Sequence, residues 1–574
     1  MSCKNSLAAH NSLLKTDIML KKLLRKIRFR QSYIEQSLTV PEPEQFRWDQ
    51  EADIVVAGFG GAGASAAIEA REQGLDVLVL DRFKGGGATT ISGGIYYAGG
   101  GTKTQIEAGF EDSVDNMFNY LKIEVDGAVI DESLRQFCEQ SVDNYNWITG
   151  HGVPFEASYC PFKTSYPPDH MFFYYSGNES FPPYSDAAKP VPRGHRGHKK
   201  GVSGQAIFEP LRKAAYRVGA KIQTQSKVVG LITDTDKNII GVKAIQLDNV
   251  FVNALHQLVS GTSSMMRYMA LYMPSLFPTF ARLAEFLELR FGTASYIRAK
   301  KGVVLATGGF FTNQIMVEEH APNYVGGSPL GTLSDDGSGI RMAMDLGAQT
   351  RYMDSVSSWR FINPPTSFVS GVLVGDTGKR VCNEMLYGAK VGHEIMKDHN
   401  GKAWVILDEH HYKQARQDLT LEKGLWFHVM LGYMYLFMGR KKANSIGALA
   451  KKLGINPQNL EETLGDYNAM AKSYELDPMG KPKDYVKPIE QGPFYAINAS
   501  YDYYWVSATS LTMGGLVVNE ETGEVLNQDN QEIKGLYAAG RTAVGIPSRG
   551  YVSGLSIADC VFSGRRAARH IAQQ

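Results

Sequence analysis

Residues 53–63, Asp-Ile-Val-Val-Ala-Gly-Phe-Gly-Gly-Ala-Gly, describe an apolar strand that ends in a glycine-rich loop. Gly58 permits a tight turn, Gly60 lets the backbone approach a pyrophosphate, and Gly63 lets the next helix pack closely on the strand. The helix expected from Ala64 to Gln73 would present its free N–H groups and positive dipole end to that phosphate. The pattern therefore predicts a dinucleotide pocket near the N-terminus.

A second strand and an acidic residue support this interpretation. The GxGxxG spacing alone is weak, because a glycine-rich loop is often only a turn. Here the helix ends at Gly74, and the apolar run 76–80 then delivers Asp81 to the position of a ribose-binding acid. A further loop at 85–94, rich in glycine and hydroxyl groups, is expected to be irregular and to wrap a cofactor.

Composition and cysteine usage exclude several classes of protein. A chain of 574 residues exceeds one ordinary core, so at least two domains are expected. The formal net charge of +1, without a basic stripe, argues against nucleic acid as a partner. The five cysteines are scattered and never spaced as CxxC, which argues against disulfides or a metal site and favours a reducing, cytoplasmic location. His195 and His198 have no nearby cysteine or acid, so a solvated basic loop is expected around them.

Three segments differ in character from the rest of the chain. Residues 1–45 form a basic extension, in which 13–30 has the spacing of a basic amphipathic helix. A helix that binds an anionic membrane surface or a partner, and a solvated or disordered extension, both fit this segment. Two apolar stretches, at about 254–296 and 424–439, lack the roughly 20 uninterrupted apolar residues of a spanning helix. Peripheral contact with a membrane and burial in a core or dimer interface both fit these stretches.

The remaining pattern indicates an α/β domain that a second domain interrupts. An apolar strand at 302–306 ends in a small polar turn, and a C-terminal strand at 535–539 precedes a final helix at 558–572. A nicotinamide cofactor needs one contiguous binding unit, whereas the long body of FAD crosses the domain and requires such a C-terminal return. We therefore expect a Rossmann-like FAD-binding domain at 46–350 and 490–574, with an inserted α+β catalytic cap domain at 351–489.

Together these pieces resemble the flavoproteins of the fumarate reductase and succinate dehydrogenase superfamily, over roughly residues 50–574. The ending Ser548-Arg-Gly-Tyr-Val-Ser-Gly-Leu-Ser556 is similar to the 3-ketosteroid dehydrogenases, closest to the Δ4-(5α) type. The Δ1 type is expected to carry Tyr-Pro-Gly here, and Val552 stands in the place of that proline. The resemblance implies non-covalent FAD, a lipophilic 3-oxosteroid substrate and an electron acceptor that the sequence does not identify.

The chemistry of a 3-oxosteroid agrees with the residues of this ending. The hydrogen on C4 is acidic because it is next to the carbonyl, whereas the hydrogen on C5 can leave only as hydride, so the protein must take a proton from C4. Tyr551 and Ser553 are two residues apart, so their hydroxyls share one face of an extended segment. By resemblance, Ser553 accepts the proton and Tyr551 assists. A tyrosine of the second domain completes the relay; Tyr387 is the candidate, with Tyr435, Tyr501, Tyr503 and Tyr504 as alternatives.

The residues predicted to hold FAD come from the separated motifs. They are Gly58, Gly60, Gly61, Ala62, Gly63, Asp81, Arg82, Gly87, Ala88, Thr89, Thr90, Ser92, Gly93, Gly94, Val228, Ala306, Thr307, Gly308, Asp336, Gly540, Arg541, Gly554, Leu555 and Ser556. The helix that opens at Gly554 would point its N-terminus at the flavin and favour the negative charge of its reduced form.

Other activities remain open. One is Δ1 dehydrogenation of the same class of substrate. Another is the reverse type of reaction, reduction of an activated double bond as in fumarate reductases, for which Arg549 would be the source of the proton. A flavin-binding or membrane scaffold without catalytic activity is a third.

Overall fold

The computed structural model describes residues 31–265, 276–360, 362–363, 365–422, 424–473, 475–503, 505–506 and 508–574. The amphipathic helix predicted at 13–30 and the alternative candidate Tyr504 lie outside these residues. Within the described ranges, no helix is both long and apolar enough to cross a membrane.

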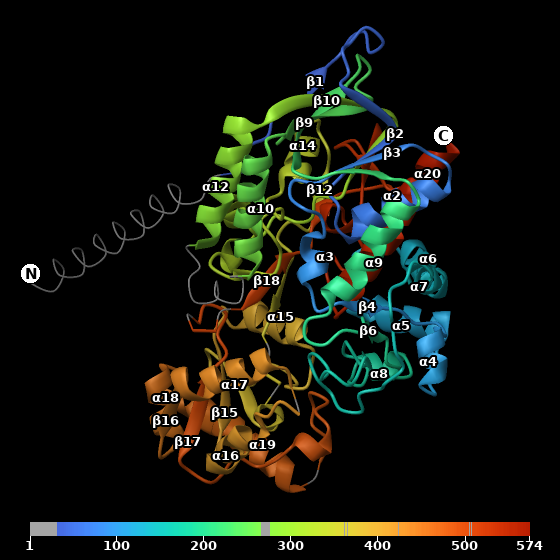
Figure 1. Ribbon diagram of the computed structural model, residues 1–574. Helices are drawn as coiled ribbons and strands as arrows, with labels where there is room; N and C mark the ends of the chain where they lie inside the picture. Colours follow the sequence, from blue (N-terminus) through green and yellow to red (C-terminus); the bar gives the residue numbers. More distant parts are fainter. Residues whose placement is uncertain are drawn as a thin grey trace, which may run out of the picture.

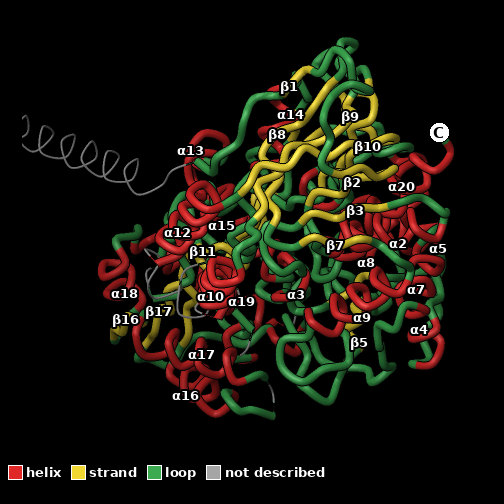
Figure 2. Tube along the Cα trace, turned by 45° about the horizontal axis from the view of Figure 1, so that its top comes forward, coloured by secondary structure: helices red, strands yellow, loops and turns green. Residues whose placement is uncertain are grey.

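A nine-stranded sheet forms the centre of the molecule and is seen in yellow in Figure 2. Its order is β1-β8-β9-β10-β2-β3-β7, and β21 pairs with β10 and with β20. Strands β10, β2, β3 and β7 run parallel, as does β21 beside β10, whereas β8, β9 and β10 are antiparallel neighbours. The strands are β1 (Leu38–Thr39), β2 (Gln50–Ala57), β3 (Val77–Leu80), β7 (Lys221–Gln223), β8 (Ser226–Thr233), β9 (Ile239–Gln246), β10 (Thr293–Leu305), β20 (Glu524–Leu526) and β21 (Glu532–Ala538).

Alternate side chains of this sheet enter two different cores. Along β2, Ile54 and Val56 join the core that contains helices α2 (Gly61–Glu72), α9 (Gly204–Arg217) and α20 (Leu555–Gln573). Val55 and Ala57 join the core on the opposite face, which contains α14 (Ser338–Asp345). A strand that is buried on both faces requires such a continuous apolar run, and this explains the sequence 54–57.

The helix of the glycine loop and the last helix of the chain pack along each other (Figure 1). Glu69 of α2 accepts hydrogen bonds from Arg565 Nε and Arg569 Nε of α20, each at 2.7 Å. Burial opposes the charge of the Glu69 carboxylate, but the two arginines lower its pKa overall. The C-terminal return predicted from the sequence is therefore fixed to the start of the dinucleotide unit.

A second, four-stranded antiparallel sheet lies below the central sheet in Figure 1, with the order β14-β15-β17-β16. Its side chains form cores separate from those of the central sheet. The elements are β14 (Val372–Gly375), β15 (Ala403–Leu407), β16 (Arg440–Ala443), β17 (Phe494–Asn498), α15 (Gly388–Asp398), α16 (Glu409–Asp418), α17 (Trp426–Met438), α18 (Ile446–Leu453) and α19 (Pro457–Ser473). The sheet includes β17, which lies beyond residue 489, and the division into an FAD-binding domain and an inserted cap domain stays a prediction.

The structure contains further helices and short strands. They are α3 (Gly87–Ile91), β4 (Ile95–Tyr97), α4 (Lys103–Glu107), α5 (Val114–Glu124), α6 (Asp131–Glu139), α7 (Ser141–Gly150), β5 (Phe173–Tyr174), α8 (Tyr184–Ala187), β6 (Gly194–Arg196), α13 (Gln314–His320), β11 (Ser328–Pro329), β12 (Thr350–Arg351), β13 (Val356–Trp359), β18 (Thr509–Thr512) and β19 (Gly515–Leu516). Helix α3 lies inside the loop at 85–94 that was expected to be irregular, so that expectation was wrong for its centre.

The described residues of the apolar stretch predicted at 254–296 belong mainly to two helices and to the start of a strand. Helices α10 (Val250–Met265) and α12 (Leu276–Phe291) stand side by side (Figure 1), and β10 begins at Thr293. Strands β9 and β10 pair directly, with Gln246 opposite Thr293. The two helices are therefore an excursion between neighbouring strands of the central sheet.

The expectation of a solvated basic loop at 193–200 was wrong for its first half. Arg193, His195 and Arg196 are completely buried around β6, and only residues 198–200 are exposed. Arg193 donates to Asp112, which is 81 positions away, at 2.8 Å. His195 is held by Thr102 and by a backbone carbonyl. Local sequence gave no sign of these partners because all but one of them come from distant segments.

The glycine loop yields a test of this packing. A Cβ at Gly63 would lie 1.9 Å from the Gly58 carbonyl oxygen, so we expect Gly63→Ala to force α2 away from β2 and to cost about 1–3 kcal/mol of stability. Gly465→Ala is the matched control, because Gly465 is exposed within α19 and its added Cβ would meet nothing within 4 Å. Thermal unfolding of both variants measures the difference. Equal melting temperatures in the two variants would contradict the close packing.

Candidate active site

A cavity of about 320 Å³ opens where parallel strands of the central sheet end. Ala57 and Leu80 end β2 and β3, and Ala306 and Ala539 directly follow β10 and β21; all four line the cavity. In open α/β sheets, ligands bind in the crevice outside the carboxyl ends of the strands. The position of the cavity thus agrees with a dinucleotide site.

The structure brings most of the predicted cofactor residues to this cavity. All of them line it except Gly63, Thr90 and Leu555. Gly63 lies against the end of β2, and Leu555 is fully buried in the core beneath α20. These residues shape the backbone of the site without reaching the cavity.

The backbone at the start of α2 fits a pyrophosphate group. Gly58 has φ +104°, and an added Cβ there would lie 2.4 Å from the Ala306 carbonyl oxygen. At Gly60 an added Cβ would meet nothing within 4 Å, so this residue faces open space. The N-cap Gly60 has no side chain to cap the helix, and the N–H groups of a first helical turn have no partner within the helix. The Gly61 N–H donates to Thr89 Oγ1 at 3.1 Å, and an anion at this position would receive the other N–H groups, together with the favourable helix dipole.

Asp81 lies where the ribose-binding acid was predicted, but it also organises the glycine loop. Its carboxylate accepts backbone hydrogen bonds from Phe59 and Phe83 at 2.8 Å and from Gly85 at 3.1 Å. Burial raises the pKa of Asp81, and these three N–H groups oppose that rise. A carboxylate offers about four acceptor positions, so Asp81 retains capacity for a ligand hydroxyl.

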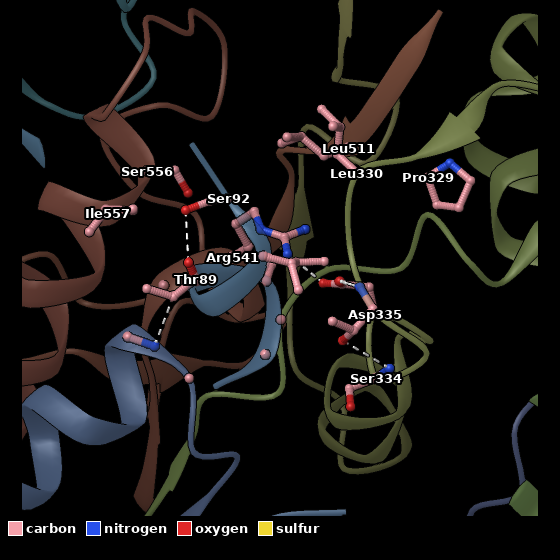
Figure 3. Close-up of a pocket in the computed structure, with 18 of the residues that line it drawn as sticks. Thr89, Ser92, Pro329, Leu330, Ser334, Asp335, Leu511, Arg541, Ser556 and Ile557 are labelled. Atoms are coloured by element: carbon pink, nitrogen blue, oxygen red, sulfur yellow. Dashed lines mark hydrogen bonds and ion pairs between the residues drawn. The ribbon is translucent and has the colours of Figure 1, made fainter. Parts of the chain in front are cut away.

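An ion pair lies at another part of the cavity wall. Arg541 donates to Asp335, and Asp335 also accepts from the backbone of Gly309 at 3.0 Å and of Thr332 at 2.7 Å. Figure 3 shows Arg541 between the hydroxyl residues Thr89, Ser92 and Ser556 on one side and the apolar residues Leu330, Leu511 and Pro329 on the other. Arg541 Nη1 is buried without a partner among the described residues, so it can donate to a bound ligand.

The three predicted catalytic residues come together at one end of the cavity. Tyr551 and Ser553 line it, just before α20 begins. Tyr387 precedes α15 and is only 2% exposed, so it lies behind the wall rather than in it. The ring of Trp359 lies 5.6 Å from that of Tyr551 and 5.9 Å from that of Tyr387. Sequence reasoning did not select Trp359, because its position at the end of β13 has no motif around it.

Burial keeps the phenol hydroxyls of Tyr387, Tyr174 and Tyr551, which lie near Ser553, protonated. Burial raises the pKa of Tyr387 well above its usual value, and the proximity of the Tyr551 hydroxyl adds to the rise, whereas a hydrogen bond with Ser553 opposes it. Burial likewise raises the pKa of Tyr551 and of Tyr174. The interaction of Tyr174 with Ser553 opposes the rise. At neutral pH these tyrosines are therefore hydrogen-bond donors and proton carriers, not phenolates. Tyr174 was not foreseen from the sequence.

The alternative candidates occupy other positions. Tyr435 lines the cavity, but its hydroxyl accepts a hydrogen bond from Arg360 at 2.8 Å. The Tyr501 hydroxyl donates to the Tyr324 carbonyl oxygen at 2.8 Å, away from Ser553. Arg549, the proton source in the reductase alternative, pairs with Asp126 at 2.7 Å and does not line the cavity.

Comparisons with known proteins identify the family of this chain. The FAD binding domain family matches residues 53–554. A 3-oxo-5-alpha-steroid 4-dehydrogenase of Comamonas testosteroni is 36% identical over 88% of this chain and 95% of its own length. A 3-ketosteroid-Δ4-(5α)-dehydrogenase of Rhodococcus jostii RHA1, solved with 4-androstene-3,17-dione, is 31% identical with a TM-score of 0.77 and covers 94% of this chain and 100% of its own. A 3-oxosteroid 1-dehydrogenase of Mycolicibacterium smegmatis is 25% identical over 91% of this chain and 97% of its own length.

The fold and the cavity define a flavoprotein oxidoreductase whose cofactor is FAD. The chain belongs to the FAD-binding family of the fumarate reductase and succinate dehydrogenase flavoproteins, and within it to the branch of the 3-ketosteroid dehydrogenases.

Glu124 is a buried acid that is linked through Asn178 to Tyr387, one of the proposed catalytic residues. Asn178 accepts the backbone N–H of Tyr387 at 2.7 Å and donates to Glu124 at 3.0 Å, and the Tyr120 hydroxyl also donates to Glu124 at 3.0 Å. Burial is the main cause that raises the pKa of Glu124 to about 7. The folded protein thus holds a proton on Glu124 at a pH where the unfolded chain has lost it.

This shift predicts how stability depends on pH. Between about pH 4.5 and 7 the folded state binds more protons at Glu124 than the unfolded state does, so its contribution to stability falls as the pH rises. Glutamine does not titrate, so we expect the pH-dependent fall in the free energy of unfolding to be about 1–3 kcal/mol smaller in Glu124→Gln than in the wild type. Melting temperatures at pH 5 and pH 8 measure it: the wild type should lose more stability than the variant. An equal loss in both proteins would contradict the assignment.

Proposed function

We propose that this enzyme introduces a C4–C5 double bond into the A ring of a 3-oxosteroid, as its Comamonas and Rhodococcus relatives are named for doing. The observation that carries the proposal is the placement of Ser553 at the cavity wall, beside Tyr551 and in contact with the buried Tyr387. The apolar wall of Pro329, Leu330 and Leu511 (Figure 3) suits a hydrocarbon ring system.

Bound FAD supplies the acceptor for the hydride that leaves C5. Ser553 accepts the proton from C4, and Tyr551, on the same face, assists it. Because a serine hydroxyl is a weak base, it must pass its own proton on as it accepts another. Tyr387 is placed to receive that proton on its hydroxyl oxygen, since it contacts Ser553 from behind the cavity wall, and it must release its own hydroxyl proton toward solvent as it does so. Trp359 packs against both tyrosines and limits their motion.

Two alternatives follow from the same site. Δ1 dehydrogenation would use the same tyrosines and serine on a steroid turned in the cavity, and the 1-dehydrogenase relative favours it. Reduction of an activated double bond, as in fumarate reductases, would need an acid at the substrate. Arg549 does not meet that need where it lies, because it is paired with Asp126 outside the cavity.

Anaerobic mixing distinguishes the alternatives. A 5α-reduced 3-oxosteroid should bleach the flavin absorbance near 450 nm and yield the 4-ene product. Formation of a 1-ene product instead would move the assignment to the Δ1 reaction. A flavin that stays oxidised with the steroid, but is reoxidised by fumarate or an enone after chemical reduction, would favour the reductase.

Substitutions test the roles of the three residues. We expect Ser553→Ala, Tyr551→Phe and Tyr387→Phe each to slow anaerobic flavin reduction by about 10²- to 10⁴-fold, because each removes a group from the path of the proton. FAD content should not change. Tyr216→Phe is the control, since Tyr216 is 53% exposed on α9. A Tyr387→Phe enzyme with the wild-type rate would exclude Tyr387 from the relay and leave the Tyr551–Ser553 pair to be tested alone.

We also propose that the enzyme docks on an anionic membrane surface through α10 and α12. Eight large apolar side chains of this pair are exposed: Val250, Phe251, Leu255, Leu258, Leu283, Phe286, Leu289 and Phe291. Arg282 and Arg290 are exposed among them on α12, and such a mixture suits anionic headgroups and the acyl chains beneath them. A membrane would also hold a lipophilic substrate.

Vesicle sedimentation tests the docking. The protein should pellet with vesicles that contain anionic lipid, and Phe251→Asp combined with Leu258→Asp and Phe286→Asp should abolish this. Leu476→Asp, at a side chain 79% exposed elsewhere, should not. These substitutions are sharper than deletion of 254–296, which would also remove the start of β10. Unchanged pelleting, or dimers that the triple variant dissociates, would overturn membrane docking.

A further inference from the structure

The inner side of the α10–α12 pair carries a buried charge cluster that its sequence does not reveal. His256 of α10 and Glu288 of α12 are 0% and 2% exposed, although their helices display apolar residues to the outside. A small apolar group of Val259, Ala284, Phe83 and Leu333 lies beside them. The pair therefore docks on the FAD-binding domain through both apolar and charged contacts.

Arg82 is the centre of this cluster. Its guanidinium donates to Glu288 through Nε at 2.6 Å and through Nη2 at 3.0 Å, and its Nη1 donates to Asp336 at 2.9 Å. The Lys227 ammonium lies 3.6 Å from Glu288. Burial opposes the charges, but Arg82 and Lys227 together lower the pKa of Glu288 far below its usual value. Two cations and two carboxylates thus neutralise one another inside the protein.

His256 links Glu288 to the loop that follows Asp81. Its Nε2 lies 3.0 Å from the Glu288 carboxylate, its Nδ1 is in hydrogen-bond contact with Gln225, and its ring stacks on Phe83 with centroids 4.9 Å apart. Phe83 in turn accepts the Gln225 backbone N–H at 3.0 Å through its carbonyl. Both helices of the pair therefore grip residues 82–83.

Three members of the charge cluster also line the cavity: Arg82, Lys227 and Asp336. They lie beside Asp81, the end of the cavity at which a dinucleotide fold places the adenosine ribose. We propose that the α10–α12 pair is a clamp for the adenosine end of FAD, in which Glu288 and His256 position Arg82 in the cavity wall. The clamp uses residues of the insert, outside the glycine motifs that bind the phosphates.

Charge balance explains why Glu288 is critical to such a clamp. Without its carboxylate, Arg82 keeps only Asp336 as an ion-pair partner, and Lys227 keeps only the longer contact with Glu285, at 3.8 Å. A buried cation that loses its partner moves toward water or another anion. Arg82 would then leave its position in the wall. Coupling between two binding events is reciprocal. If docking of the α10–α12 pair raises the affinity for FAD by some factor, bound FAD strengthens the docking of the pair by the same factor.

The test compares Glu288→Gln with Glu285→Gln. Glu285 lies one turn earlier on α12 and accepts the Tyr33 backbone N–H. It lies 3.8 Å from Lys227 but is not among the hydrogen-bond partners of Arg82, so it is a matched carboxylate that does not position Arg82. We expect the Kd for FAD, measured by flavin fluorescence, to rise by about 5- to 150-fold in Glu288→Gln and to stay within twofold in Glu285→Gln. The rise in melting temperature on addition of FAD should shrink in the first variant only.

The fragments of FAD locate the effect. Glu288→Gln should weaken ADP binding to the apoprotein and leave FMN binding unchanged. Should Glu288→Gln fail to fold, His256→Leu serves instead and should raise the FAD Kd in the same direction, by less. The clamp would be overturned by equal Kd values for FAD in Glu288→Gln and Glu285→Gln. It would also be overturned if Glu288→Gln weakened ADP binding and FMN binding equally. None of these readouts depends on the steroid, so a failed clamp and a failed substrate assignment are distinguishable.

Discussion

The close approach of α2 to the end of β2 is the contact on which the rest of this site depends. A Cβ at Gly63 would lie 1.9 Å from the Gly58 carbonyl oxygen, so only glycine allows the helix to begin this close to the strand. That position aims the start of α2 at the cavity. It also sets α2 in line with α20, whose Arg565 and Arg569 hold Glu69. The last segment of the chain, with Tyr551 and Ser553 just before α20, is thereby brought to the same cavity as the first.

The phosphate-binding part and the proposed catalytic part of the cavity depend on different interactions. At the phosphate end, backbone N–H groups and a helix dipole are available to the ligand, and glycines serve because they leave space. At the other end, the proposed chemistry rests on side chains from three distant segments, whose hydroxyls gather around Ser553. Burial keeps their phenols protonated, so they can pass a proton on without storing charge. The proposed clamp adds a third device, a balanced ionic cluster, at the adenosine end.

The sequence predicted best where local spacing carries the meaning. The glycine loop, the position of Asp81 and the pairing of Tyr551 with Ser553 all depend on residues a few positions apart, and the structure places them along one cavity. It predicted poorly where partners are remote. His195 was assigned to a solvated loop, although Thr102, 93 positions away, holds it inside the protein. Trp359 and Tyr174 lie at the proposed catalytic cluster without any motif to mark them.

By itself, the sequence determined the cofactor class, the parallel core of the fold and the segment that carries the proposed chemistry, because strand patterns, glycine spacing and a short C-terminal motif are local properties. Only the tertiary structure decided which residues of the apolar insert face the rest of the protein. No motif in its sequence marks His256 and Glu288 as buried or Phe251 and Phe286 as exposed. Glu288 becomes a partner of Arg82, 206 positions away, only when β9 and β10 pair and fold α12 against the cavity wall.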